Sequence, residues 1–282
     1  MRMKNAALLG VRALRGRDGT RSRQVSIAMN HNYSAALAAI LPRQTSNIAH
    51  YTLAGNETVW VRKVGKTIPR WRYTLIGCLA ATLRLRALKP VPNTGGRAAI
   101  AVEAARLQTL AAHGVRVPRL LASDDDGLMF THLGEHTLLE CIEHEDSLAR
   151  WQQGLAAIKS VHERGQYLSE SFARNMIVGD DGGIGFIDFE EDPGRYLPLP
   201  ACQSRDYLCY LQSTALILKR RGCLDSAVRR WSDHAAALPP AIADDIRTAA
   251  RPMLWMRALH HPRWGKDTLR LAALAEMFYR AR

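Results

Sequence analysis

Residues 162–192 read HERGQYLSESFARNMIVGDDGGIGFIDFEED. Two short apolar runs, Met176–Val178 and Ile184–Ile187, flank a turn rich in Asp and Gly. Such runs around an Asp/Gly cluster predict a β-hairpin. This hairpin would bring Asn175, just before its first strand, close to Asp188 at the end of its second strand. A carboxamide and a carboxylate that converge in this way suit Mg²⁺, a hard cation that takes few protein ligands and keeps waters and phosphates.

This stretch resembles the catalytic and metal-binding loops of the protein-kinase-like phosphotransferases. The closest resemblance is to the small bacterial branch that includes the lipopolysaccharide (Kdo) sugar kinases. In the superfamily a catalytic Asp is followed five residues later by Asn, and then by a hairpin ending in Asp-Phe-Gly or Asp-Phe-Glu. Asn175 matches the Asn, and Asp188-Phe189-Glu190 matches the second motif. Two departures stand out: Glu170, one methylene longer, occupies the position of the catalytic Asp, and Leu168-Ser169 replaces the usual His-Gly.

The resemblance implies an α+β, two-lobed protein-kinase-like fold, with a small antiparallel-sheet N-lobe and a mainly helical C-lobe. It implies that Asn175 and Asp188 bind Mg²⁺, that Asp188 is also catalytic, and that Glu170 orients or deprotonates the acceptor hydroxyl. It gives His162 a structural role, bonded to the loop backbone. It also implies that Asp206, 18 residues after Asp188, is a buried acceptor of backbone N–H groups from the catalytic loop.

A second hairpin is predicted at 49–64, where Gly55-Asn56 separates two strand-like runs. Because side chains alternate along a strand, Lys63 shares a face with two valines, and Arg62 points the other way. A Lys in the third strand of these kinases holds the ATP phosphates and pairs with a helix Glu. The resemblance gives this role to Lys63 and makes the Gly55 turn the phosphate loop. The alternative for Lys63 is a solvated residue at a strand end.

Residues 98–113 have the periodicity of a helix with one apolar stripe. Glu103 is the only acid in this helix and lies next to the stripe. We therefore expect it to reach inward to Lys63. Two strand-like segments follow and lead to a hinge near Leu133-Gly134.

The chain of 282 residues has three predicted parts, of which composition indicates the arm and the resemblance implies the two lobes. The predicted organisation is a disordered basic arm at 1–28, a nucleotide-binding N-lobe at 46–135 and a helical C-lobe at 136–282. The arm holds seven Lys or Arg and one acid, which is +6 of the net charge of +13, and Met29 is an alternative start to Met1. A charge of this sign predicts an anionic partner: phosphate ligands, an acidic membrane surface or nucleic acid.

The segment from Thr58 to Val102 contains nine cations and no acid. Within its basic insert, 66–97, the uncharged run 73–83 is shorter than the ~18 residues that span a bilayer. It fits a helix lying in the interface of an anionic leaflet. The alternative is a helix packed on the nucleotide lobe. Five cysteines without a CxxC pair or zinc spacing predict free thiols in a reducing cytoplasm. The expected location is cytoplasmic, peripheral on the inner membrane if 66–97 contacts lipid.

Taken together, the residues and the resemblance predict a kinase that transfers phosphate from ATP, with Mg²⁺, to an alcohol group. The acceptors considered are a sugar hydroxyl of lipopolysaccharide or another membrane glycolipid, and a protein Ser or Thr. A catalytically weak pseudokinase scaffold is the alternative, since Glu170 and the missing Gly-rich loop favour it. Gly65-Lys66-Thr67 is no Walker A motif, because position 60 is Trp where the motif needs Gly. Charge alone indicates nucleic-acid binding, and no stacking-aromatic motif accompanies it, so no specific nucleic-acid partner is predicted.

Overall fold

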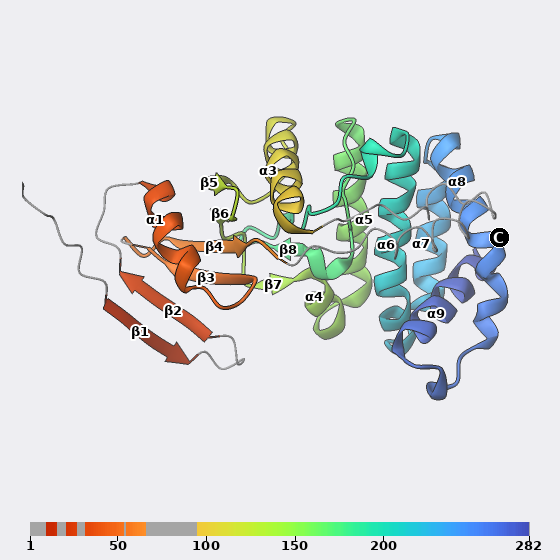
Figure 1. The fold of residues 1–282 in the computed structure, drawn as a ribbon. Coiled ribbons are helices and arrows are strands. Elements are labelled where there is room, and N and C mark those ends of the chain that lie inside the picture. Colours follow the sequence, from red (N-terminus) through yellow and green to blue (C-terminus); the bar gives the residue numbers. More distant parts are fainter. Residues whose placement is uncertain (1–9, 16–20, 27–31, 54, 66–94, 282) are drawn as a thin grey trace, which may run out of the picture.

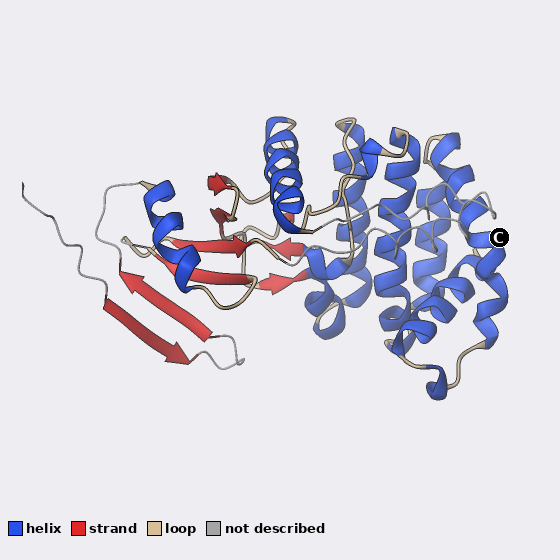
Figure 2. Ribbon diagram, in the orientation of Figure 1, coloured by secondary structure: helices blue, strands red, loops and turns tan. Residues whose placement is uncertain are grey.

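The computed structural model describes residues 10–15, 21–26, 32–53, 55–65 and 95–281. This part of the chain forms an α+β fold with a small, largely antiparallel sheet and a mostly helical remainder. The sheet lobe and the helical lobe lie at opposite ends of the molecule (Figures 1 and 2). The predicted α+β class is confirmed, and the predicted sheet N-lobe and helical C-lobe are compatible with this arrangement.

The larger sheet has the strand order β1-β2-β3-β4-β6-β5 among the described residues. Its strands are β1 (Gly10–Arg15), β2 (Arg21–Ser26), β3 (Ile48–Thr52), β4 (Thr58–Lys63), β5 (Leu120–Asp124) and β6 (Gly127–Thr131). The predicted hairpin at 49–64 is confirmed as β3 and β4, which pair antiparallel. Gly55 and Asn56 in its turn both have positive φ, 87° and 60°, a backbone conformation that Gly and Asn adopt most readily.

Within the arm predicted to be disordered at 1–28, the described residues 10–15 and 21–26 form β1 and β2, and the rest of the arm lies outside the described residues. These two strands pair antiparallel with each other, and β2 extends the sheet by pairing in parallel with β3 through Arg23↔Tyr51 and Gln24↔Thr52. Strand β2 is held in the sheet by backbone hydrogen bonds to β3, a segment distant in sequence, and the local composition of the arm does not reveal this pairing. The basic insert falls almost wholly on residues 66–94, outside the described residues, and so does the predicted interfacial helix.

Each face of the sheet is covered by a different helix. Helix α1 (Tyr33–Ile40) packs on the face that carries Val59 and Val61, both fully buried. Helix α3 (Gly96–Ala112) confirms the helix predicted at 98–113 and packs on the other face, against Leu128 and Phe130. No element is predicted for 33–40, yet α1 decides which face of β4 is closed off.

The helical lobe contains the main core, in which Trp151, Tyr207 and Tyr210 are completely buried. Its helices are α4 (Leu138–His144), α5 (Ser147–Glu163), α6 (Leu199–Arg220), α7 (Leu224–Ala236), α8 (Pro240–Ala250) and α9 (Lys266–Arg280). A small sheet, β7 (His136–Thr137), β8 (Met176–Val178) and β9 (Ile184–Phe186), lies on the side that faces the sheet lobe (Figure 1). Strands β8 and β9 confirm the hairpin predicted from the apolar runs at 176–178 and 184–187. Within the described residues, no helix combines the length and apolar character needed to cross a bilayer.

Candidate active site

A cavity of about 200 Å³ lies between the two lobes. Ile48, Trp60 and Phe130 of the sheet line one side, and Ile177 and Asp188 of the helical lobe line the other. The connection 131–134, which includes the predicted hinge, also lines the cavity. Most of the lining is apolar, and the charged groups gather at one end, as in sites that hold a small ligand in a fixed orientation.

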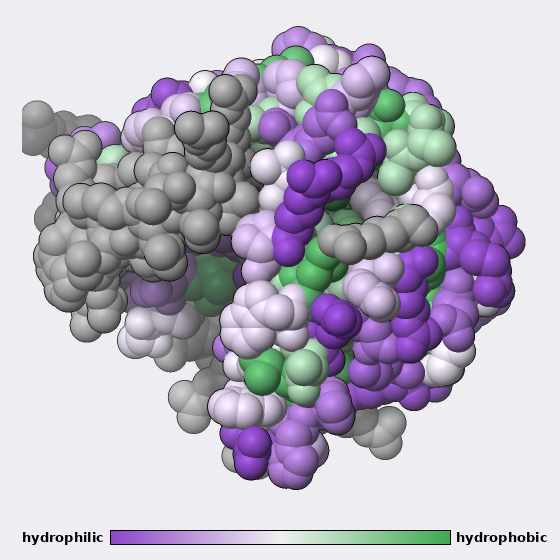
Figure 3. Space-filling view, turned by 90° about the vertical axis from the view of Figure 1, so that its right-hand side faces the viewer, coloured by the Kyte–Doolittle hydropathy of each residue, from purple (hydrophilic) through white to green (hydrophobic). Residues whose placement is uncertain are grey.

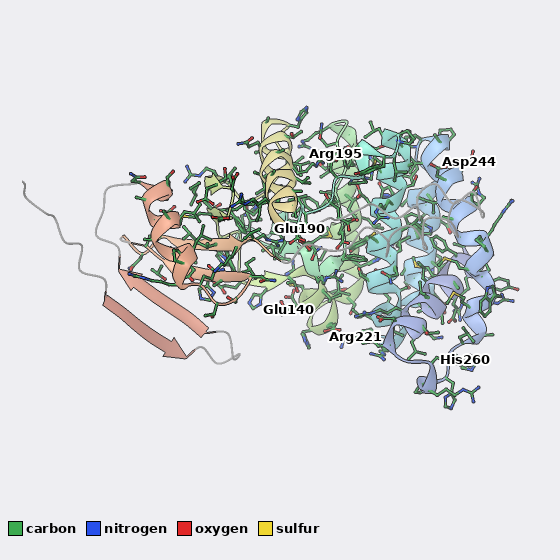
Figure 4. The ribbon with its side chains drawn as sticks, in the orientation of Figure 1. Glu140, Glu190, Arg195, Arg221, Asp244 and His260 are labelled. Atoms are coloured by element: carbon green, nitrogen blue, oxygen red, sulfur yellow. The ribbon has the colours of Figure 1, made fainter. Side chains whose placement is uncertain are left out.

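Arg62 is the centre of the charged end. Its Nε lies 3.1 Å from Oε2 of Glu103 and its Nη2 lies 3.3 Å from Oδ1 of Asp188. A third ion pair joins it to Glu190, which Figure 4 places where the sheet lobe meets the helical lobe. One half-buried guanidinium therefore connects α3, strand β4 and the segment after β9, so it holds the lobes together at the mouth of the cavity.

The predicted pairing of Lys63 with Glu103 is wrong. Lys63 donates through Nζ to the carbonyl oxygen of Gln44, at 3.1 Å, and Arg62 takes the place beside Glu103. The reason is the alternation of side chains along β4. Lys63 follows Val61 on the face that α1 covers, whereas Arg62 follows Trp60 on the face that α3 and the helical lobe share. A second hollow of about 410 Å³ adjoins the cavity at Arg62, and Lys63 does line this one.

The Gly55 turn does not lie where a phosphate loop was predicted. Gly55 lines neither the cavity nor the adjoining hollow, and a Cβ added there would meet no atom within 4 Å. The hairpin contributes to the adjoining hollow from its opposite end, where Asn47 and Gly65 are among the lining residues. The cavity is lined by Trp60 in the middle of β4 and by the pair Ile48 and Arg62 at the end of the hairpin opposite the turn, so it lies along the half of the hairpin away from Gly55.

The predicted convergence of Asn175 and Asp188 is confirmed. Asn175 Nδ2 donates to the backbone oxygen of Glu170 at 3.1 Å and to Oδ2 of Asp188 at 3.2 Å. Asn175 is buried at the start of β8, and Ile187 donates its backbone N–H to the Asn175 carbonyl at 3.0 Å. The carboxamide thus fixes the loop at Glu170 and the carboxylate at Asp188 in one arrangement.

Asp188 has a strained backbone, with φ of 73°. Among the described residues, only Asn56 and Asp188 have positive φ without being glycine. A residue of this kind in the left-handed region costs about 1–3 kcal/mol and is found mostly where function requires a particular side-chain direction. At Asp188 the conformation turns the carboxylate out of the strand direction of β9 and toward Asn175 and Arg62.

Three acids near the cleft share an environment that favours their protonated forms. Burial raises the pKa of Glu103 to about 7, an effect that Arg62 opposes and Asp188 reinforces. Burial also raises the pKa of Glu170, and the negative charge of Asp188 raises it further. The positive charge of Arg174, whose Nη2 lies 3.6 Å from Glu170 Oε2, lowers it. The pKa of Glu191 rises to about 7, again chiefly through burial and then through Glu170. A carboxylate whose pKa lies nearer to neutrality accepts a proton more effectively at physiological pH.

Asp206 of α6 holds the loop that carries Glu170 by a hydrogen bond to its backbone. This fully buried carboxylate accepts the backbone N–H of Leu168 at 2.8 Å, which confirms the predicted role. The prediction that His162 bonds to the loop backbone is wrong for its ring. The ring Nε2 instead lies 2.9 Å from the same Asp206 oxygen. The histidine therefore acts on the loop through Asp206. Asp206 lies within α6, seven residues after the helix begins at Leu199.

The oxygens of Asn175 and Asp188 are of the kind that binds a magnesium ion, and both Asp188 oxygens already bond to protein groups, one to Arg62 and one to Asn175. Asn175 uses its Nδ2 on Glu170 and Asp188, so its Oδ1 is left as a donor for a cation beside a carboxylate. The described residues contain no group of three or more His, Cys, Asp or Glu that could hold a metal by themselves. Two protein oxygens without further ligands suit Mg²⁺, which takes the rest of its octahedron from water and phosphate.

Two charged residues of the site, Arg62 and Glu190, are not among the predicted ones. Both have a signal in the sequence: Glu190 stands inside the Asp-Phe-Glu motif, and Arg62 stands beside Lys63. The sequence does not show that helix α1 packs on the face of β4 that carries Lys63. Compared with known proteins, the chain matches no family model and no curated sequence.

Proposed function

We propose that the chain is an ATP- and Mg²⁺-dependent phosphotransferase that transfers a phosphoryl group to an alcohol. The observation that carries the proposal is the cleft, where an apolar cavity ends at Arg62 and at the Asn175–Asp188 pair. An apolar slot next to a cation and two hard oxygen donors matches the parts of a nucleotide: a flat base, a charged phosphate chain and its divalent ion.

Each residue of the cleft has a place in this proposal. Arg62, held by Glu103, stabilises the charge of the ATP phosphates, the role that the resemblance implied for Lys63. Asn175 and Asp188 hold Mg²⁺, which neutralises phosphate charge when bound. Glu170 accepts the proton of the acceptor hydroxyl as the hydroxyl oxygen bonds to the γ-phosphorus, while the bond from that phosphorus to the bridging oxygen breaks and ADP leaves. Positioning and charge stabilisation supply most of the rate in such reactions.

The acceptor that we propose is a sugar hydroxyl of lipopolysaccharide or of another membrane glycolipid. It follows from the resemblance of residues 162–192 to the bacterial sugar kinases and from the basic character of the chain. A protein Ser or Thr is the second acceptor class. Incubation with γ-labelled ATP and, in parallel, lipopolysaccharide, a glycolipid extract and Ser/Thr peptides distinguishes the two by the fraction that becomes labelled.

A nucleotide-binding scaffold without transfer activity is the second candidate function. Both oxygens of the Asp188 carboxylate are engaged, by Arg62 and by Asn175, and Glu170 is the longer acid at the position of the catalytic Asp. In this case ATP would bind without being consumed.

The decisive experiment combines binding and turnover. ATP and GTP, each with and without Mg²⁺, are tested by thermal shift on the wild type and on Asp188→Ala, and hydrolysis or transfer is measured on the same samples. We expect ATP with Mg²⁺ to raise the melting temperature of the wild type and Asp188→Ala to remove turnover. Binding without turnover supports the scaffold, and absence of both rejects a nucleotide function for the cleft.

A further inference from the structure

A separate hollow of about 540 Å³ lies in the helical lobe, at the end of the molecule away from the sheet. It is formed by α7, α8, α9 and the 3₁₀ helix η5 (Arg251–Ala258), and no residue that lines it belongs to the cleft. Figure 3 faces this end of the molecule and shows apolar surface in a hollow between hydrophilic ridges. The hollow is therefore a groove that is open to one side.

The floor and the rim of this groove differ in chemistry. Trp231, Ile246, Leu254 and Phe278 contribute to an apolar floor that small alanine side chains leave open. The charged residues that line it are two arginines, Arg247 and Arg251, and no acid is among its described lining residues. An apolar floor with a few polar groups at one edge, in a volume of ~300–1,000 Å³, is the usual form of a small-molecule site.

The charge around the groove favours an anion. Residues 246–266, which supply part of the groove lining, contain five Lys or Arg and no Asp or Glu, and Asp244 and Asp245 directly precede them. Arg247 is ion-paired with Asp244, an exposed residue that Figure 4 shows on α8. Arg251 is exposed, and it has no ion pair or side-chain hydrogen bond within the described residues. Arg251 is thus the arginine of the groove whose charge can pair with an anionic ligand.

We propose that this groove binds a single-chain anionic amphiphile of the long-chain fatty-acid class. The hydrocarbon chain lies on the floor between α7, α8 and α9, and the carboxylate meets Arg251, with Arg247 next to it. Burial of the chain supplies a non-directional attraction, and the guanidinium supplies a charge-assisted bond. This inference is independent of the proposed kinase activity.

The test is isothermal titration calorimetry of the full chain with oleate below its critical micelle concentration, and with neutral monoolein as the comparison. We expect oleate to bind more tightly than monoolein. Arg251→Glu should weaken oleate about tenfold or more, through loss of one charge-assisted contact, and should leave monoolein little changed. Ala243→Phe and Ala236→Phe place a ring in the groove from half-exposed or exposed positions, and each should abolish binding of both ligands.

The control is Arg257→Glu, which makes the same charge change on the same 3₁₀ helix at a residue that does not line the groove. Because Arg257 donates to the Leu254 carbonyl at 2.8 Å and lies over the Tyr279 ring, the melting temperatures of both variants are measured alongside. Arg257→Glu should bind oleate like the wild type. Equal weakening by Arg251→Glu and Arg257→Glu would reduce the effect to nonspecific attraction and overturn the proposal. So would oleate binding that ATP with Mg²⁺ displaces, which would put the ligand in the cleft. Binding to anionic phosphatidylglycerol vesicles with no response to free oleate would also overturn it, in favour of a lipid-surface contact.

Discussion

Arg62 has three carboxylates within ion-pair distance, those of Glu103, Asp188 and Glu190. Its neighbour Lys63 has the same charge and nearly the same length, but it bonds to the Gln44 carbonyl on the opposite face of β4. The two residues therefore offer a matched pair for testing which cation serves the cleft. Only the face of the strand differs between them.

We predict that Arg62→Ala lowers ATP-dependent turnover about 100-fold, the usual scale for removing one preorganised charged donor. Lys63→Ala should lower it less than about tenfold, because Lys63 reaches only the adjoining hollow. Steady-state kinetics of both variants, with melting temperatures to confirm folding, is the measurement. A larger loss for Lys63→Ala than for Arg62→Ala would contradict the assignment.

Glu103 should make stability depend on pH. Its pKa is about 7 in the folded chain and about 4.5 when exposed, so between these values the folded state holds a proton that the unfolded state has released. The contribution is present below pH 4.5 and is lost as pH rises through 7, with a slope of about 1.4 kcal/mol per pH unit. Glu191 adds a change of the same sign, and His234, whose pKa falls to about 4 through burial, adds one of opposite sign.

The difference between the wild type and Glu103→Gln isolates this contribution. Urea unfolding of both proteins from pH 5 to pH 8 should show the wild type losing stability relative to Glu103→Gln as pH rises. A constant difference across this range would mean that Glu103 stays ionised beside Arg62.

At the scale of elements, the site depends on short connections that bring separate segments into contact. Asp206 on α6 holds the Leu168 N–H, and Asn175 at the start of β8 holds the Glu170 carbonyl. The connection between β6 and β7 passes so close to β8 that Gly134 has no room for a side chain: a Cβ there would lie 2.5 Å from the Val178 carbonyl oxygen. Gly134 also lines the cavity, so packing of this connection and the shape of the site are linked.

We expect Gly134→Ala to push the 131–134 connection away from β8. The overlap should cost about 1–3 kcal/mol of stability and weaken ATP binding about tenfold. The control is Gly182→Ala, in the exposed β8–β9 turn, where a Cβ meets nothing within 4 Å and the cost is backbone strain alone. Chemical unfolding and nucleotide titration of both variants separate the two effects; unchanged ATP affinity in Gly134→Ala would show that the connection does not shape the site.

At the scale of the molecule, α3 belongs by packing to the sheet lobe but is tied to the helical lobe. Arg106 of α3 is buried, donates to the Tyr167 carbonyl at 2.6 Å and stacks over the Tyr167 ring at 4.0 Å. The Tyr167 hydroxyl in turn donates to Asp192, beyond the Asp-Phe-Glu motif. Together with Arg62, this contact sets how the lobes sit around the cavity.

Arg106→Ala should therefore destabilise the whole chain by about 2 kcal/mol, the scale of a lost hydrogen bond to a charged group with its cation–π contact. Arg97→Ala is the control on the same helix, because its pairs with Asp125 and Asp126 are largely exposed and such pairs contribute about 0–1 kcal/mol. Denaturant unfolding measures both. Equal losses in the two variants would remove the argument that α3 ties the lobes together.

The sequence by itself determined the hairpins at 49–64 and 176–187, the helix that carries Glu103, and the meeting of Asn175 with Asp188. These features are set by alternation, turn residues and spacing within a few tens of residues, which local physical chemistry specifies. Only the tertiary structure decided that Arg62 rather than Lys63 meets Glu103, that the Gly55 turn lies away from the cavity, and that β2 extends the sheet. Each of these depends on which distant segment covers a given face or edge, and no local pattern contains that information.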